Sequence, residues 1–131
     1  QLTAVTLQNS RLEQLLKNSN VEPVLLSKKG WWGSIRAAFH LARLFEQKKI
    51  DLVHVHYAKD LPIVGLAKKL SRQKVVVVHT RQMEMPGSKK DPFHRWVYSQ
   101  VDHMICVTEK LKKDVTERVP LAPQKISRLY Y

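Results

Sequence analysis

The sequence contains a single cysteine, Cys106, and only four glycines among its 131 residues. One cysteine cannot form an internal disulfide, and no residues near it have metal-ligand spacing, which favours a reducing compartment. The sequence has no G-x-G-x-x-G fingerprint, no Walker lysine loop and no G-x-S-x-G elbow. A complete nucleotide site of these kinds is therefore not encoded in these residues.

Long apolar runs are also missing. The longest aliphatic run, Val75–Val78, is far shorter than the roughly 20 residues that span a bilayer. The first residues do not combine a basic head with an apolar stretch, so no secretory signal is visible. Together with the lone cysteine, these absences lead us to expect a cytoplasmic protein.

Acidic residues are scarce relative to basic ones: 23 Lys and Arg face 11 Asp and Glu, which gives a net charge of +12. This excess suits an anionic partner, whether nucleic acid, an acidic membrane surface or a phosphorylated substrate. The basic residues are spread along the chain, without a basic helix or an aromatic stacking platform, so we expect no specific nucleic-acid partner.

Two adjacent tryptophans, Trp31 and Trp32, lie close to Lys28, Lys29 and Arg36. Amphipathic rings beside cationic side chains are typical of a membrane interface. Two tryptophans packed beneath a loop would give the same sequence, so both interpretations stay open.

Short aliphatic runs alternate with helical patterns along the whole chain. The pattern predicts strands at 2–7, 21–26, 51–57, 74–79, 102–107 and 125–131. It predicts helices at 11–18, after a cap at Ser34, at 61–70, after Asp91-Pro92, and at 109–119 after a cap at Thr108. This alternation indicates one Rossmann-like α/β domain over residues 1–131, with a mostly parallel sheet and helices on both faces. Because the chain opens and stops on strands, we expect it to be truncated at both ends.

The most continuous β-branched run, in strand 74–79, predicts a central strand that is buried on both faces. His79 and Thr80 stand at its end, and ligands of open parallel sheets bind at the carboxyl ends of strands. A neutral imidazole there can bond a sugar hydroxyl or accept a proton, and a protonated one can pair with phosphate. A histidine that only terminates the strand and bonds a loop carbonyl is the alternative interpretation.

His54 and His56 are two positions apart on a predicted strand and share one face. No third ligand lies at a supporting distance in sequence, so we expect no metal. His56 is nearer the carboxyl end and is the candidate ligand contact, whereas His54 is expected to be a satisfied interior group.

Arg81 and Glu109 are the charged candidates at the same edge. Arg81 opens a long basic loop that runs to Lys90; its guanidinium can clamp a phosphate or carboxylate, although a solvated loop is equally consistent. Glu109 in a first helical turn suits the helix dipole and can also bond a sugar hydroxyl, and the amides of that turn could hold an anion.

Four stretches carry a resemblance to a known family. They are Asp51-Leu-Val-His-Val-His56, Val75-Val-Val-Val-His79-Thr80, Val101-Asp-His-Met-Ile-Cys-Val-Thr-Glu109 and Lys125-Ile-Ser-Arg-Leu-Tyr-Tyr131. In this order they resemble the amino-terminal, acceptor-side domain of group 1 (family 4) glycosyltransferases, which have the GT-B fold. The stretches around His79, Lys89–Tyr98 and Thr108–Lys112 look like bacterial members that build lipopolysaccharide.

The resemblance implies a retaining, metal-independent transferase that uses a UDP- or GDP-sugar as co-substrate and no other cofactor. It implies that His79 lies in the interdomain cleft near the transferred sugar and acceptor, and that His56 and Glu109 line the same cleft. Together with the residue patterns, this leads us to expect His79 as the catalytic residue and His56, Thr80, Arg81 and Glu109 as substrate-binding residues. It also implies a lipid-linked or anionic glycan acceptor and contact with the inner face of the cytoplasmic membrane. The family's first strand with its Gly-rich loop, and its donor-binding second domain, have no counterpart here, so these residues alone are expected to be inactive.

Two other classes of function stay open at the level of sequence. One is a non-catalytic module that binds nucleic acid, which the basic composition alone suggests. The other is a carbohydrate- or anion-binding α/β module without chemistry.

Overall fold

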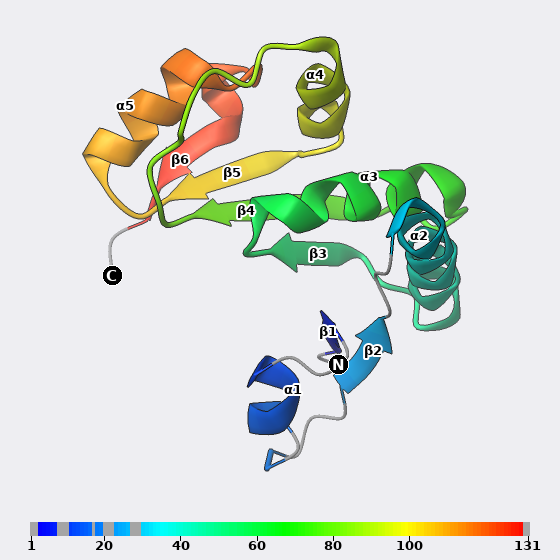
Figure 1. The fold of residues 1–131 in the computed structure, drawn as a ribbon. Coiled ribbons are helices and arrows are strands. Elements are labelled where there is room, and N and C mark those ends of the chain that lie inside the picture. Colours follow the sequence, from blue (N-terminus) through cyan, green and yellow to red (C-terminus); the bar gives the residue numbers. More distant parts are fainter. Residues whose placement is uncertain (1–2, 8–10, 17, 20–22, 27–29, 130–131) are drawn as a thin grey trace.

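The computed structural model describes residues 3–7, 11–16, 18–19, 23–26 and 30–129 (Figure 1). Its strands are β1 (Ala4–Leu7), β2 (Pro23–Leu26), β3 (Leu52–Val55), β4 (Val76–Arg81), β5 (His103–Cys106) and β6 (Ile126–Arg128). Its helices are α1 (Arg11–Leu16), α2 (Gly30–Gln47), α3 (Leu61–Leu70), α4 (Pro92–Ser99) and α5 (Glu109–Arg118). Short 3₁₀ turns precede α3 and β6. Parts of the predicted strands 2–7, 21–26 and 125–131 and of the predicted helix 11–18 lie outside the described residues.

The strands form parallel sheets, as the alternating pattern predicts. Strands β3, β4, β5 and β6 lie in that order in a 4-stranded parallel sheet, and β1 pairs with β2 in a separate 2-stranded parallel sheet. In Figure 1 the arrowheads of β3, β4 and β5 point to the same side, so the carboxyl ends of these strands share one edge. The α/β, Rossmann-like fold class is thus confirmed.

Three residues are predicted to cap the start of a helix, and the structure confirms two of them. The Asp91 carboxylate accepts a hydrogen bond from the His94 amide at 3.1 Å, and the Thr108 hydroxyl accepts one from the Leu111 amide at 3.1 Å. The predicted cap at Ser34 is wrong, because α2 already begins at Gly30 and the Ser34 hydroxyl donates to the Gly30 carbonyl at 3.2 Å. A serine inside a helix commonly bonds the preceding turn in this way.

Strand β4 differs from the prediction in position and in burial. It runs two residues past His79, to Arg81, and it begins at Val76. Val77 and His79 are buried on one face, but Val76 on the other face is 41% exposed. The prediction of burial on both faces is therefore wrong for the first residue of this strand, because a β-branched run reports strand propensity as well as burial.

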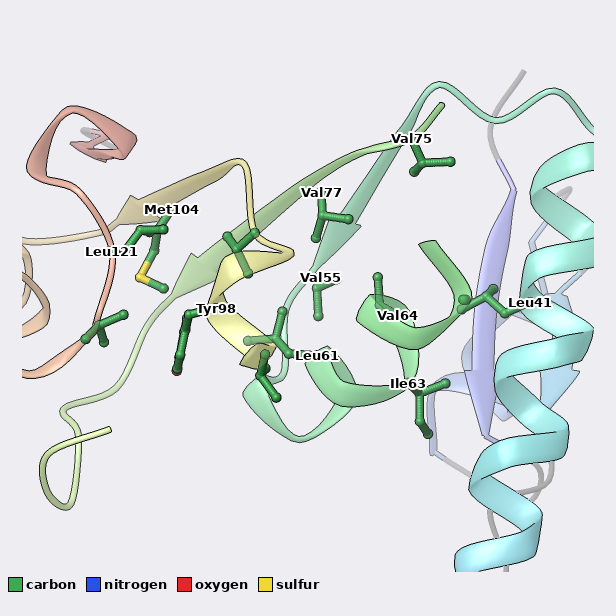
Figure 2. Close-up of a cluster of buried hydrophobic side chains, with 14 of the residues drawn as sticks. Leu41, Val55, Leu61, Ile63, Val64, Val75, Val77, Tyr98, Met104 and Leu121 are labelled. Atoms are coloured by element: carbon green, nitrogen blue, oxygen red, sulfur yellow. The ribbon is translucent and has the colours of Figure 1, made fainter. Parts of the chain in front are cut away.

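The hydrophobic core lies between the 4-stranded sheet and the helices. Figure 2 shows Val55, Val75 and Val77 of the sheet region clustered with Leu61 and Val64 of α3. Helix α3 in turn packs closely on α2. Among the described residues, no helix is both long enough and apolar enough to cross a bilayer.

A polar clasp joins the amino ends of β4 and β5. The Asp102 amide donates to the Val77 carbonyl at 2.9 Å, and the Val77 amide donates to Asp102 Oδ2 at 2.8 Å. Lys68 Nζ of α3 also donates to Asp102 Oδ2, at 2.7 Å. Burial alone would raise the pKa of Asp102, but the hydrogen bonds and the charge of Lys68 outweigh it and lower the pKa. One carboxylate therefore fixes the register of two strands and anchors a helix on them.

We expect Asp102→Asn to lower the free energy of unfolding by about 1 kcal/mol at neutral pH, because the amide loses the charge that strengthens both hydrogen bonds at a partly exposed site. Since folding lowers the pKa of Asp102, its stabilisation is present above the unfolded value of about 3.9 and is lost as the pH falls through the folded value. Urea unfolding at neutral and acidic pH measures the difference. Glu117→Gln, on the exposed side of α5, is the control, and equal stability of both variants would contradict the role of the clasp.

Candidate functional site

The carboxyl edge of the 4-stranded sheet gathers most of the candidate residues. Histidine 79 lies near the carboxyl end of β4, and the parallel register places it opposite Val55 of β3 and Met104 of β5. Thr80 and Arg81 follow it within the strand, and His56 comes directly after β3. The pairing of β3 with β4 brings His56 to the same edge as His79, Thr80 and Arg81.

The imidazole of His79 is held in one tautomer. Its Nδ1 lies 2.9 Å from the Val55 carbonyl oxygen. A carbonyl oxygen only accepts hydrogen bonds, so Nδ1 carries the proton and Nε2 of the neutral ring keeps a free lone pair. His79 is 0% exposed, and within the described part of the chain its Nε2 has no hydrogen-bond partner. The expectation that the strand ends at His79 is therefore wrong, because β4 continues to Arg81 and the ring lies in the interior.

The electrostatic surroundings favour the neutral form of His79. Burial is the largest cause and lowers the pKa, the hydrogen bond to Val55 opposes it, and the charges of Arg81, His54 and His56 lower the pKa further. A neutral imidazole with a bare, buried nitrogen is an unsatisfied acceptor, which native structures rarely leave without a partner or a function.

His54, His56 and Thr80 form a small polar group on the face of the sheet opposite the His79 ring. The rings of His54 and His56 have centroids 4.3 Å apart, and His54 Nε2 lies 2.5 Å from the Thr80 hydroxyl. His54 is thus satisfied as expected, although it is exposed rather than interior, and Thr80 is 2% exposed. Partial burial, followed by the charge of His56, lowers the pKa of His54. His56 is exposed and can reach a ligand from solvent.

Arg81 bonds the loop that follows it. Its Nε donates to the Met83 carbonyl at 2.7 Å and its Nη2 donates to the Glu84 carbonyl at 3.1 Å. In this conformation the guanidinium shapes the turn, and its charge acts on nearby groups such as His79 and Tyr98 through space.

The loop between β4 and α4 is attached to α5. The Met85 amide donates to the Asp114 carboxylate at 3.3 Å, and Arg118 donates to the Met85 carbonyl at 3.4 Å. Arg118 also pairs with Asp114 at 2.7 Å, and the Lys89 amide donates to the Arg118 carbonyl at 2.9 Å. The side chain of Met85 is buried. These contacts hold the loop against α5, and we call the segment 83–89 the loop wall.

Glu109 lies at the β5–β6 side of the same edge. Its carboxylate accepts a hydrogen bond from Arg128 at 3.2 Å. Cys106 ends β5, between β4 and β6 in the sheet. Burial raises the pKa of its thiol, the charges of Arg81 and Lys112 lower this pKa, and the charge of Glu109 raises it. Arg81 and Glu109 therefore both lie within electrostatic reach of Cys106, but among the described residues no hydrogen bond or ion pair joins Glu109 to His79.

Arg128 is a site residue that the sequence reasoning missed. It ends β6, so the rule that selected His79 and Glu109, a polar group at the carboxyl end of a parallel strand, selects Arg128 as well. Within the residues described, no group of three or more His, Cys, Asp or Glu side chains is arranged to hold a metal ion. The expectation of a metal-independent site stays a prediction.

Replacing Asp114 with Asn is expected to loosen the loop wall. The variant loses the charge that bonds the Met85 amide and Arg118. We expect the free energy of local opening of this loop to fall by about 1.4 kcal/mol, which makes its amide hydrogens exchange roughly tenfold faster. Hydrogen exchange of the segment 83–89 measures this change. Glu117→Gln on the same helix is the matched control, and unchanged exchange in Asp114→Asn would mean that the carboxylate does not hold the loop.

We also expect His79 to remain the neutral, Nδ1-protonated tautomer down to pH values at which ordinary histidines are charged. An unfolded histidine gains a proton near pH 6.5. Since folding lowers the pKa of His79, the folded state binds fewer protons below that pH, and stability falls as the pH decreases through this range. Long-range proton–nitrogen spectra of the imidazole nitrogens report the tautomer, with exposed His40 as the comparison signal. A protonated His79 near pH 6.5, or a proton on Nε2, would contradict the assignment.

The fold has known counterparts. A glycosyltransferase from Rickettsia africae ESF-5 superposes with a TM-score of 0.72 at 15% identity, over 98% of this chain and 34% of that one. The apo form of the lipopolysaccharide outer core galactosyltransferase WaaB superposes with a TM-score of 0.64 at 13% identity, over 86% of this chain and 31% of that one. The chain therefore spans about a third of the length of these structures.

At the level of sequence, no curated protein matches the chain. The family model described as Glycosyltransferase Family 4 matches residues 4–130, which is nearly the whole chain. This match agrees with the four stretches that carry the resemblance and with the parallel sheet that positions His79. The chain belongs to glycosyltransferase family 4.

Proposed function

We propose that this chain is the acceptor-side domain of a retaining glycosyltransferase that moves a sugar from a UDP- or GDP-sugar to a lipid-linked or anionic glycan of the cell envelope. The single observation that carries the proposal is the buried Nε2 of His79 near the carboxyl end of β4, which has no hydrogen-bond partner among the described residues. Family membership supports the reaction class, and this geometry supports the choice of His79.

The chemistry assigned to His79 follows from its tautomer. A neutral ring with Nδ1–H bound to the Val55 carbonyl presents Nε2 as a rigid acceptor. A sugar hydroxyl donating to Nε2 would satisfy the orphaned nitrogen and orient the sugar at the reacting centre. The ring is already fixed by the Val55 carbonyl, but Nε2 is buried, so the groups that cover it must move aside before a hydroxyl can reach it.

The remaining candidates are assigned supporting roles. His56 and Thr80, on the opposite face of the sheet from the His79 ring, offer polar groups to sugar hydroxyls at the same edge, while Arg81 supplies positive charge for a phosphate or carboxylate. Glu109 binds a hydroxyl at the other half of the edge, where Arg128 orients it. We assign no metal and no cofactor besides the nucleotide-sugar co-substrate.

The nature of the acceptor is proposed from two supports. One structural counterpart is named a lipopolysaccharide outer core galactosyltransferase. The chain also carries a net charge of +12, which complements the phosphates of an anionic acceptor. We accordingly place the protein in the cytoplasm, peripherally on the inner face of the membrane. Since the chain covers about a third of its counterparts, we assign donor binding to the rest of the protein and no activity to these residues alone.

Substituting His79 in the intact protein tests the proposal. His79→Asn keeps a donor at the position of Nδ1 for the Val55 carbonyl but removes the acceptor at Nε2, so we expect kcat/KM to fall about 100-fold or more. His79→Gln places an amide near the position of Nε2 and is expected to recover part of that loss. Transfer from UDP- and GDP-sugars to lipopolysaccharide acceptors measures the effect.

Thermal unfolding of each variant accompanies the assay, because His79 is buried and its replacement can affect folding. His94→Gln is the matched control, since His94 is a partly buried histidine on α4 that pairs with Asp91. Unchanged turnover in a folded His79→Asn variant would remove His79 from the mechanism.

A further inference from the structure

Tyr57 is an exposed aromatic residue at the carboxyl edge of the 4-stranded sheet. It comes two residues after the end of β3 and is 68% exposed. In Figure 1 the chain leaves the arrowhead of β3 at this edge and turns directly into the start of α3. Ligands of open parallel sheets bind at this edge, so Tyr57 stands where a substrate arrives.

Tyr57 lies on the same face of the sheet as the His79 ring. The ring centroids of His54 and His56 are 4.3 Å apart, which shows that the alternation of β3 continues past its last residue, Val55. The backbone at Tyr57 is also extended, with φ −110° and ψ 124°. Alternation therefore turns Tyr57 to the face of Val55 and His79, whereas His56 is on the opposite face.

The backbone on both sides of Tyr57 is anchored. Val55 is buried before it, and after it Ala58 packs partly against the core and Leu61 is buried at the start of α3. The Asp60 amide donates to the Tyr57 carbonyl at 3.0 Å and closes the 3₁₀ turn that precedes α3. An exposed ring on a fixed turn loses little conformational freedom when a ligand packs on it.

The Tyr57 side chain is not used within the described part of the fold, where it makes no hydrogen bond and no ring contact. A single exposed aromatic residue is common on protein surfaces. Here a second large apolar residue, Met83, is 72% exposed two residues after the end of β4, at the same edge. Arg81 Nε donates to the Met83 carbonyl at 2.7 Å, so this segment is fixed as well. Two neighbouring strands thus lead into exposed apolar groups at the ligand edge.

A sugar ring suits an exposed aromatic ring that has polar groups close by. A pyranose carries C–H groups on its faces and hydroxyls around its rim, so one face can pack on an aromatic ring while the hydroxyls remain free to form hydrogen bonds. The packing removes apolar area of both partners from water. A small anion such as phosphate gains nothing from such a ring, so Tyr57 favours the sugar part of a substrate.

We propose that Tyr57 is a specificity-determining residue for the acceptor: its ring stacks on the pyranose that carries the reacting hydroxyl and holds it on the face of the sheet where His79 lies. The inference deepens the proposed function and rests on it for the glycan acceptor. Because His79 Nε2 is buried, Tyr57 holds the sugar at the surface and makes no bond to the reacting atoms. Tyr57 is thus a positioning residue, and its loss weakens acceptor binding without changing the chemical step.

Kinetics of the intact protein test this role, with the deacylated core oligosaccharide of lipopolysaccharide as the acceptor. Tyr57→Ser is expected to raise the acceptor KM about tenfold and to leave kcat and the KM of the nucleotide sugar unchanged, because only the packing on the acceptor ring is lost. Tyr57→Phe keeps the aromatic ring and is expected to behave like the wild type. An unchanged acceptor KM in Tyr57→Ser, or an equal rise in Tyr57→Phe, would overturn the proposal.

Controls separate stacking from folding and from charge. Phe39→Ser removes an exposed ring from α2, which lies away from the strand arrowheads in Figure 1, and is expected to keep the wild-type KM. Tyr57→Ser is expected to unfold at the wild-type temperature, because the residue is exposed. The ratio of its acceptor KM to that of the wild type is expected to be the same at low and high salt, since stacking does not depend on charge. A ratio that disappears at high salt, or an equal rise in Phe39→Ser, would contradict the stacking role.

Binding measured without transfer distinguishes this inference from the proposed function. In proton spectra of the oligosaccharide mixed with the intact protein, saturation of aromatic protons is expected to reach the C–H protons of one pyranose in the wild type and in Tyr57→Phe, but not in Tyr57→Ser. A protein that transfers sugar with the same acceptor KM in all variants would contradict the stacking role and leave the proposed function supported. A protein that binds the oligosaccharide through Tyr57 but transfers no sugar would contradict the proposed function and leave the stacking of Tyr57 on a sugar ring supported.

Discussion

The arrangement of the site depends on how Asp102 holds Val77. Asp102 bonds both the carbonyl and the amide of Val77, once through its own amide and once through its carboxylate. This pairing sets β5 against β4 two residues before His79. A slip of one residue between parallel strands would turn every side chain of the slipped strand to the other face, so a clasp that holds the register at one end also fixes the faces at the other. The position of His79 in the core is therefore decided at the amino end of the strand.

The burial of His79 has an energetic consequence. One hydrogen bond, to Val55, partly offsets the desolvation of the ring, but Nε2 has no partner among the described residues. An unsatisfied buried polar atom costs about 1–3 kcal/mol. A valine, such as its neighbours Val77 and Val78, would avoid that cost at this position. The histidine thus lowers stability at the point where the fold offers a ligand edge, which is the usual compromise at a functional site.

The sequence predicted most of the fold because short-range physics determines most of it. The bounds of helix Leu61–Leu70 and the caps at Asp91 and Thr108 follow from local spacing and capping chemistry, and the structure confirms them. The cap at Ser34 was wrong because the helix begins earlier, at Gly30, whose positive φ of 66° suits a glycine at a chain reversal.

The site was less predictable, since its contacts depend on neighbours across the sheet. That His79 lies near a ligand edge follows from the strand pattern, but its full burial depends on neighbours that are distant in sequence, such as Val55 of β3 and Met104 of β5. The attachment of the Met85 segment to Asp114 joins residues far apart in sequence, and no local pattern announces it. The pairing of Glu109 with Arg128 is of the same kind. Such contacts become visible only when the register is known.

The net charge shows how the structure refines a bulk property. A charge of +12 indicates an anionic partner but not where it binds. Several cations are already engaged internally: Lys68 with Asp102, Arg118 with Asp114 and Arg81 with loop carbonyls. Their charge stabilises the fold around the site and is less available for binding. Arg36 and Arg43, on the exposed face of α2, have no ion-pair partner among the described residues, so part of the charge that can attract an anion lies on a helix whose other face belongs to the core.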